Sequence, residues 1–435
     1  MTLSEGALRY VNTARENCPE NTFAVEKAIA LSLTVMFLNF ALREMQFLPA
    51  VMPDEAAWIA LLEQRAGGLT PPISGPLFAW LVASVKDSVG LTLSSTVLAI
   101  AVVSSGFAVI TTFFVYRRLL GSHSLALAGV MMLLTTSYFV GPNFESRPQQ
   151  VATILLLIVC LHHFKNNHVA PTGVTFLLVP LMYWHILTFA VCAGALSIIT
   201  SYRWWGGQLS FRDAMQWAVM FCLLTGSLIF SSGYEAIFLD VYANHWKLPV
   251  SPFVAFVLIF LTLQVACFFA VRLWHSSVRE KIGEQMPSLI LARSVTLAVM
   301  LGMQIQLLPE TAVYYARQNG ITLALWHLGN AVFFIFFILG YAHLIKPREN
   351  DPFEPFFIGS TILALIAVMA LLLSIGMLHK NWAIRVLYCW ILFASPVCVV
   401  GIRHVITHLN RALIPLWCLL VFSAISHITQ AKILL

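Results

Sequence analysis

The chain has 435 residues, of which 59% are hydrophobic and only 10% are charged, and its mean hydropathy is +0.84. This composition excludes an ordinary soluble protein and predicts a polytopic membrane protein, because about 20 apolar residues span a bilayer and such runs recur along the chain. The formal net charge of +6 fits the basic bias of cytoplasmic membrane loops and gives no reason to expect a nucleic acid partner.

Polar breaks between the apolar runs predict about thirteen membrane helices in a single transmembrane domain, residues 1–435. The predicted spans are 27–48, 90–116, 122–140, 148–164, 171–184, 186–202, 212–231, 249–274, 288–308, 322–345, 356–378, 382–402 and 410–429. The mixed-charge leader, residues 1–26, does not match a cleaved signal peptide. A shorter segment, Gly75 to Lys86, is predicted to lie along the membrane as an interfacial helix. The predicted fold class is an all-α membrane bundle.

The basic residues predict the orientation of this bundle, because cytoplasmic loops of membrane proteins collect Lys and Arg. With the N-terminus inside, most of the 25 Lys and Arg residues fall at cytoplasmic ends. The main polar breaks then share the outer side, and these are the acid pair Asp54–Glu55 and residues 141–150, 183–185, 231–248 and 309–320. We expect them to line one extracytoplasmic cavity, because short helices beside two of the breaks leave loop residues at membrane depth.

The first outer loop carries a motif that extends beyond its two acids. Pro53-Asp54-Glu55-Ala56-Ala57-Trp58 is followed by Gly67-Gly68 and then by Pro71-Pro72-Ile73-Ser74-Gly75-Pro76-Leu77. This stretch resembles the first extracytoplasmic loop of the GT-C superfamily of integral-membrane glycosyltransferases, and most resembles the branch with the protein O-mannosyltransferases and the lipid A aminoarabinose transferase. The resemblance rests on motifs over residues 27–90 and on topology to residue 231.

The resemblance implies a catalytic module in residues 1–231 and variable C-terminal helices in residues 232–435. It also implies a donor sugar carried on polyprenyl phosphate, with Asp54 as the catalytic base and Glu55 as its neighbour. Two features depart from the family pattern. His185 stands at a helix break where the family often has a lysine, and there is no soluble C-terminal domain. The acceptor, whether a lipid, a glycan or a protein, therefore stays open.

Transfer from such a donor needs few catalytic groups, because its phosphate leaves readily without being protonated. One general base takes the proton from the acceptor hydroxyl as that oxygen attacks the anomeric carbon, which gives a single inverting displacement. Asp54 is the predicted base, and Glu55 either orients it or serves as an alternate. The competing interpretation is that the two acids only cap a helix beginning near Ala56, since Asp is a favoured N-cap and acids suit a first turn.

The leaving phosphate needs a partner, and the fork of a guanidinium group binds phosphate oxygens bidentately. Arg147 is the leading candidate because it directly precedes a helix predicted to begin at Pro148, whose positive end adds to anion binding. His185 and Lys247 follow it. Two alternatives are a surface ion pair between Arg147 and Glu145 and a purely structural hydrogen-bonding role for His185.

The longest outer loop supplies the predicted acceptor-binding residues, Tyr234, Glu235 and Asp240, for which solvated surface is the alternative. We expect no tightly bound cofactor or metal. His404 and His408 have a spacing that metal sites use, but they lack a nearby acid and fall on the cytoplasmic side. A divalent metal remains an alternative because the wider superfamily includes metal-dependent members.

Two other classes compete with a glycosyltransferase. A transporter or channel also buries charges in the membrane and often shows internal repeats, which we do not find in this chain. A glycan polymerase or ligase favours a large outer loop rich in Arg and His, which residues 231–248 resemble only modestly. We predict a multi-pass glycosyltransferase in a bacterial inner membrane, with a cytoplasmic N-terminus and an active site facing the periplasm or exterior.

Overall fold

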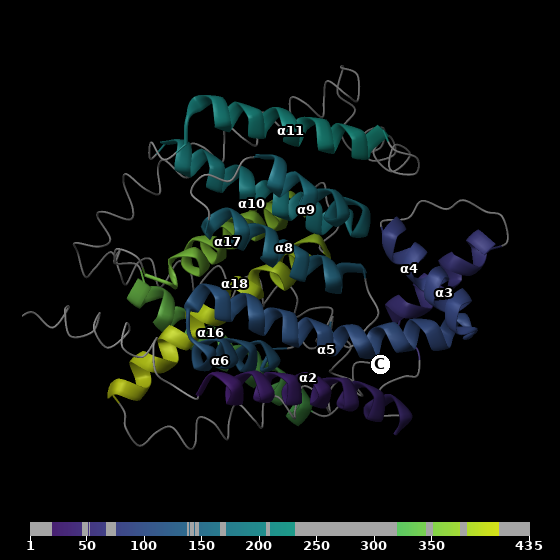
Figure 1. Ribbon diagram of the computed structural model, residues 1–435. Helices are drawn as coiled ribbons and strands as arrows, with labels where there is room; N and C mark the ends of the chain where they lie inside the picture. Colours follow the sequence, from purple (N-terminus) through teal and green to yellow (C-terminus); the bar gives the residue numbers. More distant parts are fainter. Residues whose placement is uncertain are drawn as a thin grey trace, which may run out of the picture.

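The computed structural model describes residues 20–45, 51, 53–66, 75–136, 139, 143, 148–165, 171–205, 209–230, 320–344, 351–374 and 381–408 (Figure 1). These residues form twelve helices and contain no strand. The helices are α2 (Glu20–Glu44), α3 (Pro53–Ala66), α4 (Pro76–Val89), α5 (Leu93–Leu120), α6 (His123–Leu134), α8 (Pro148–Lys165), α9 (Pro171–Trp184), α10 (Ile186–Trp205), α11 (Phe211–Phe230), α16 (Gly320–Leu344), α17 (Glu354–Ser374) and α18 (Asn381–His408). The described chain is all-helical, as its composition predicts.

Ten of the predicted spans overlap described helices, and the helix predicted from Gly75 to Lys86 forms as α4. The other three, 249–274, 288–308 and 410–429, lie outside the described residues, so the total of thirteen stays a prediction. A further helix, α3, lies between the first predicted span and α4.

Three described helices are long and apolar enough to cross a membrane, and the apolar segments are Val25–Glu44, Leu93–Leu120 and Val386–Val405. The outer faces of α2 and α5 are apolar as well, with the side chains of Leu33, Phe37, Val103 and Phe107 more than half exposed. Soluble proteins rarely expose such continuous apolar faces, whereas lipid solvates them. These two helices therefore have the surface of lipid-facing helices.

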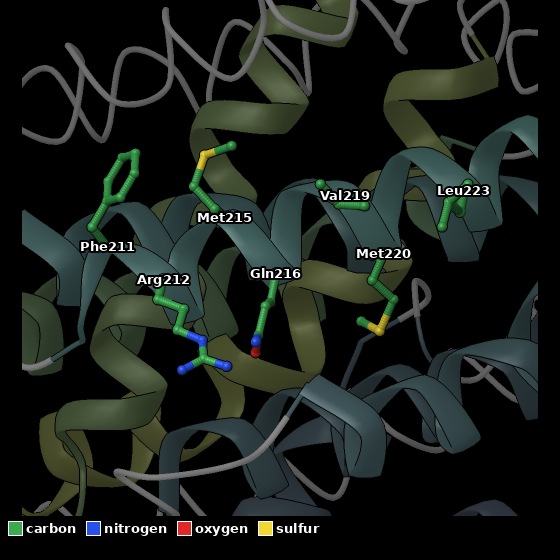
Figure 2. Close-up of a pocket in the computed structure, with 7 residues that line it drawn as sticks. All are labelled: Phe211, Arg212, Met215, Gln216, Val219, Met220 and Leu223. Carbon is green, nitrogen blue, oxygen red and sulfur yellow. The ribbon is translucent and has the colours of Figure 1, made fainter.

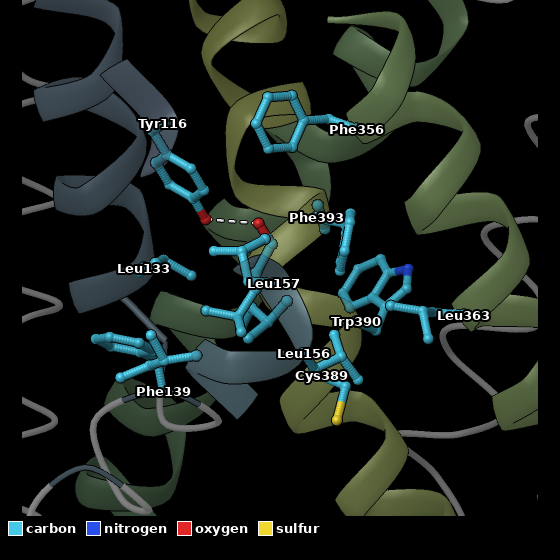
Figure 3. Packing of buried hydrophobic residues seen from close by; sticks show 14 of the residues in the cluster. Tyr116, Leu133, Phe139, Leu156, Leu157, Phe356, Leu363, Cys389, Trp390 and Phe393 are labelled. Atoms are coloured by element: carbon cyan, nitrogen blue, oxygen red, sulfur yellow. Dashed lines mark hydrogen bonds between the residues drawn. The ribbon is translucent and has the colours of Figure 1, made fainter. Parts of the chain in front are cut away.

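The apolar segment of α18 lies inside the bundle, whereas that of α2 lies at its edge. The buried share is 83% for Val386–Val405 and 28% for Val25–Glu44. Trp390, Phe393 and Phe356 pack in the centre of the buried cluster (Figure 3). The bundle is therefore organised around α18, with α16, α17 and α6 against it.

Pro396 lies within α18 and interrupts its hydrogen bonding. Because proline has no N–H, it gives no helical hydrogen bond to the carbonyl of Leu392, four residues earlier. The hydroxyl of Tyr116 in α5 donates to that carbonyl at 2.5 Å. Tyr116 is fully buried, and its ring meets Phe356 edge-on with ring centroids 5.5 Å apart (Figure 3). A buried hydroxyl thus joins α5 to α18 beside the proline.

Glycines let the parallel helices α16 and α18 approach closely. A Cβ added at Gly340 would collide with the carbonyl group of Val397, and one added at Gly401 would collide with that of Phe336. Both obstacles are backbone atoms, which do not move aside as a flexible side chain does. The two glycines therefore set the distance between these helices.

One end of the bundle is covered by α3 and α4, which lie together at the right of Figure 1 beside the start of α5. Phe78 and Val82 of α4 pack with Val97 of α5 in a small buried cluster, and Trp58 of α3 meets Phe78 edge-on with ring centroids 5.0 Å apart. The opposite face of α4 is exposed, including Trp80 at 67%. This amphipathic packing holds α3 and α4 against the bundle, and we call this region the α3–α4 end.

Candidate functional site

A buried ion pair joins Arg43, in the last turn of α2, to Glu55, in the first turn of α3. The two guanidinium nitrogens Nη1 and Nη2 donate to Oε2 and Oε1 of Glu55 at 2.7 and 2.8 Å. Both side chains are only 1% exposed. Two parallel short hydrogen bonds between ionised groups make this a strong and directional contact. It fixes the start of α3 relative to the first membrane helix.

Asn39 orients the arginine of this pair from one helical turn earlier. Its Oδ1 accepts a hydrogen bond from Nε of Arg43 at 3.1 Å, and its Nδ2 donates to the carbonyl of Ala101 in α5 at 3.3 Å. Asn39 is fully buried. The ion pair therefore belongs to a connected network that spans α2, α3 and α5, which is how a buried charge pair avoids unpaired polar atoms.

Asp54 is the second residue of α3, because the helix begins at Pro53. Its side chain lies outside those that the structure describes, so its catalytic role stays a prediction. Glu55 does more than cap a helix, since both of its carboxylate oxygens bind Arg43. The predicted roles of Glu55, which are to orient Asp54 or to serve as an alternate base, stay predictions.

The first turn of α8 is bound on one side by a polar cluster. The side-chain oxygen of Gln150 accepts from the hydroxyl of Ser104 in α5 at 2.7 Å, and its Nε2 donates to the carbonyl of Asn143 at 2.8 Å. All three residues are at least nine-tenths buried. This cluster attaches the start of α8 to α5 and holds Asn143 against it.

His185 lies between α9 and α10 and is 3% exposed. Its Nδ1 accepts the backbone N–H of Thr188 at 3.2 Å and lies 2.8 Å from the hydroxyl of the same residue. This is the geometry of an N-cap for α10, which begins at Ile186. The structure thus gives Nδ1 a capping role, while the predicted binding of phosphate by His185 stays a prediction.

Three chain segments meet where α4 begins. A Cβ added at Gly75 would lie 2.6 Å from the carbonyl oxygen of Trp184 and 3.1 Å from Cβ of Pro148. Gly75 precedes α4, Pro148 begins α8, and Trp184 ends α9. The residue before α4, the start of α8 and the end of α9 are therefore adjacent, while the predicted extracytoplasmic cavity stays a prediction.

The remaining predicted site residues, Arg147, Lys247, Tyr234, Glu235 and Asp240, lie outside the described residues and stay predictions. Sequence reasoning missed Arg43 and Asn39. Both are polar residues near the end of the first apolar span, spaced four apart on one helix face, and that spacing was the available signal. An arginine so close to a pair of acids is a natural partner for one of them.

Metal ligands do not gather in the described residues, which contain no group of three or more His, Cys, Asp or Glu side chains suited to a metal. His404 instead pairs with His343 of α16, with ring centroids 5.5 Å apart. A pocket of about 580 Å³ lies along α11, lined by Phe211, Arg212, Met215, Gln216, Val219, Met220 and Leu223 (Figure 2). Of the predicted site residues whose side chains the structure describes, Glu55 and His185, neither lines it.

An all-helical chain with long apolar helices, lipid-compatible outer faces and a buried charge network at one end is a helical membrane protein. No protein-family model matches the chain, and no curated protein matches it. Among solved structures it is similar to the crystal structure of ArnT from Cupriavidus metallidurans bound to undecaprenyl phosphate. The TM-score is 0.34 and the identity 12%, over 89% of this chain and 79% of that chain. A likeness at this level assigns no function.

Proposed function

We propose that the chain is a membrane glycosyltransferase that moves a sugar from a polyprenyl-phosphate-linked donor to an acceptor hydroxyl on the extracytoplasmic face. The observation that carries the proposal is the buried pair of Arg43 and Glu55, which fixes the start of the acid-bearing helix α3. Of the two acids in the motif, Glu55 has Arg43 as its structural partner. The backbone of the adjacent Asp54 is thereby held at a defined position at the start of α3.

The two acids take different roles in this proposal. Both carboxylate oxygens of Glu55 accept from Arg43, so its negative charge is compensated and its strongest acceptor positions are in use. A general base instead needs an oxygen within about 2.6–3.2 Å of the hydroxyl that it deprotonates. Asp54 lies on the same helix directly before Glu55, about 100° away around the helix axis. We assign the base to Asp54 and a positioning role to Glu55.

The reaction is a single displacement at the anomeric carbon. Asp54 takes the proton of the acceptor hydroxyl as its oxygen forms the new bond to that carbon. The bond from the anomeric carbon to the phosphate oxygen breaks, and its electron pair leaves with the polyprenyl phosphate. The configuration of the sugar inverts. Arg147, His185 and Lys247 are the proposed contacts to the leaving phosphate, and Tyr234, Glu235 and Asp240 the proposed contacts to the acceptor.

The finer assignments also belong to this proposal. They are the GT-C fold, with residues 1–231 as its catalytic module, a bacterial inner membrane, a cytoplasmic N-terminus and an outward-facing site. The positive-inside bias and the motif of the first outer loop support them. The acceptor is a lipid, a glycan or a protein. Measuring sugar transfer to each of these three classes of acceptor identifies which one the enzyme uses.

Sugar transfer from radiolabelled polyprenyl-phosphate donors tests the proposal, with purified wild type compared to Asp54→Asn at equal yield and melting temperature. We expect the variant to lose about a hundredfold or more of the activity, as general bases contribute. Asp87→Asn is the control, because Asp87 is an exposed acid on the neighbouring helix α4, and it should transfer like wild type. Equal transfer by wild type and Asp54→Asn would reject the base assignment, and absence of transfer from every donor would reject the function.

A further inference from the structure

The two faces of α11 differ in what covers them. The inner face packs into the bundle through Trp217 and Phe221, which are buried and stack with ring centroids 6.3 Å apart. Phe221 also stacks on Phe189 of α10, with centroids 6.2 Å apart. The outer face carries an apolar stripe with one residue per helical turn, whose members are between 46% and 69% exposed: Phe211, Met215, Val219 and Leu223. The described helices therefore leave this apolar face open.

The pocket of about 580 Å³ runs along this outer face (Figure 2). Its described lining includes two polar side chains, Arg212 and Gln216, and both lie in the part of the pocket where α11 begins. From Val219 to Leu223 the described lining is apolar. The pocket thus has a polar end and an apolar body, which is the polarity of an amphiphile with a charged head and a hydrocarbon tail.

Arg212 supplies a positive charge at the polar end. It is exposed, and neither of the ion pairs between described residues includes it. The adjacent Asp213 binds Ser210 instead, since its Oδ2 accepts from the serine hydroxyl at 2.7 Å and its N–H donates to that hydroxyl at 3.2 Å. Ser210 thereby caps α11. Arg203, near the end of α10, adds a second base on the other side of the connection, so two bases accompany one acid there.

An aromatic pair lies at the same end of the pocket. Trp204, near the end of α10, meets the ring of Phe211 with centroids 5.8 Å apart. Tryptophan is enriched at the depth of the lipid headgroups, because its ring is amphipathic. From Phe211 to Leu223, α11 rises about 18 Å. That length is close to one leaflet, since the hydrocarbon core of a bilayer is about 30 Å thick.

We propose that the outer face of α11 binds an anionic glycerophospholipid, with its phosphate at Arg212 and Gln216 and an acyl chain along Val219 and Leu223. A guanidinium binds phosphate oxygens bidentately, and the glutamine amide can donate a further hydrogen bond. An anionic headgroup matches the excess of bases better than a zwitterionic one. The predicted orientation puts this end on the cytoplasmic side, opposite the proposed donor site, where the leaflet is negatively charged.

Ordinary lipid-facing surface is the alternative to a specific site, and α5 provides the comparison. Val103 of α5 is 58% exposed, close to the 53% of Val219 on α11. Arg118, in the last turn of α5, is exposed like Arg212. Neither Val103 nor Arg118 lines the pocket along α11. α5 therefore offers a matched apolar residue and a matched base that lie outside the pocket.

Native mass spectrometry of the full chain in detergent tests the headgroup, with equal amounts of phosphatidylglycerol and phosphatidylcholine that carry the same acyl chains. Wild type should retain phosphatidylglycerol preferentially. Arg212→Gln should reduce this preference about fivefold, the effect of one base near an anionic membrane surface, and Arg118→Gln should not. Equal retention of the two lipids by wild type would overturn the proposal. So would equal preferences in Arg212→Gln and Arg118→Gln.

Val219→Trp tests the acyl chain, because the indole fills the pocket. It should abolish the preferential retention of phosphatidylglycerol, whereas Val103→Trp should retain the lipid like wild type. Both positions are open, so the two variants should melt at the wild-type temperature. Full retention in Val219→Trp, or a lower melting temperature than that of Val103→Trp, would contradict an open lipid-binding face. A wild-type dimer that Val219→Trp dissociates would assign the face to a second copy of the chain instead.

This inference does not depend on the proposed function, because it needs only a membrane and the outer face of α11. Sugar transfer by wild type without a preference for phosphatidylglycerol would leave the function in place and reject the lipid site. A preference that Arg212→Gln removes, in a protein that transfers from no donor, would support the lipid site and reject the function.

Discussion

Glu55 and Arg43 are twelve positions apart in the chain and meet through two parallel hydrogen bonds of 2.7 and 2.8 Å, with both side chains 1% exposed. The pair joins the end of α2 to the start of α3. A buried pair is not by itself a large source of stability, because both ions lose their hydration. Its value here is positional, since it fixes the start of α3, where Asp54 also lies.

Breaking this pair on one side should be costly. Arg43→Met leaves the Glu55 carboxylate buried and uncompensated, and we expect the free energy of unfolding to fall by about 3–5 kcal/mol. The double variant Arg43→Met with Glu55→Leu should recover most of that loss, because an apolar pair needs no hydration. Unfolding of the purified protein in mild detergent measures these values.

The exposed pair of Lys86 and Asp87 provides the control, since its nitrogen and oxygen are 3.5 Å apart and both side chains are largely exposed. Lys86→Met should change stability by less than about 0.5 kcal/mol.

The double variant at Arg43 and Glu55 should fold yet transfer sugar poorly, since Asp54 is no longer held in position. A double variant with full activity would show that the pair has no positioning role.

Removing the hydroxyl of Tyr116 should destabilise the protein, because Pro396 cannot replace the hydrogen bond that this hydroxyl donates to the carbonyl of Leu392. Tyr116→Phe leaves the carbonyl of Leu392 without the hydrogen bond that the proline also fails to supply, at an expected cost of about 1–3 kcal/mol. Pro396→Ala restores an N–H at that position. In the Pro396→Ala background, Tyr116→Phe should therefore cost less, and a double-mutant cycle of unfolding free energies measures the difference. Equal costs in the two backgrounds would contradict this coupling.

The close crossing of α16 and α18 should tolerate no side chain at its glycines. Gly340→Ala and Gly401→Ala each direct a methyl group into the backbone of the facing helix, so we expect lower melting temperatures and poor yields. Gly194→Ala in α10 is the matched control, because among the described residues its new methyl would meet only Ile366 Cδ1, at 3.7 Å. That variant should gain about 0.5–1 kcal/mol from the helix preference of alanine. Similar losses at all three positions would reject the crossing geometry.

Cysteine labelling in intact cells tests the predicted orientation. Asp87 at the end of α4 and Arg118 at the end of α5 are both exposed, and the predicted topology puts them on opposite sides of the membrane. A membrane-impermeant maleimide should label Asp87→Cys from outside, and Arg118→Cys only after permeabilisation. The unsubstituted chain serves as the background for its own cysteines. The reverse labelling pattern would place the N-terminus outside.

Much of the helical layout follows from the sequence, because apolar length and polar breaks are local properties. The helix break at residues 183–185 was predicted from the sequence, and α9 and α10 indeed meet there. α3 was harder to recognise, since its acids and exposed polar side chains are typical of a loop, and the pairing of Glu55 with Arg43 is not a local property of the sequence. The three spans predicted beyond the described residues remain expectations.

The contacts of the candidate site could not be predicted from local sequence patterns alone. The sequence itself determined that Asp54 and Glu55 are adjacent acids in a polar loop of a membrane chain, because composition and motif are properties of the order of residues. Only the tertiary structure decided that Arg43 binds Glu55 and that Gly75 brings the start of α4 against Pro148 and Trp184. Hydrogen bonding and charge compensation depend on distances between segments, and packing of the helices sets those distances.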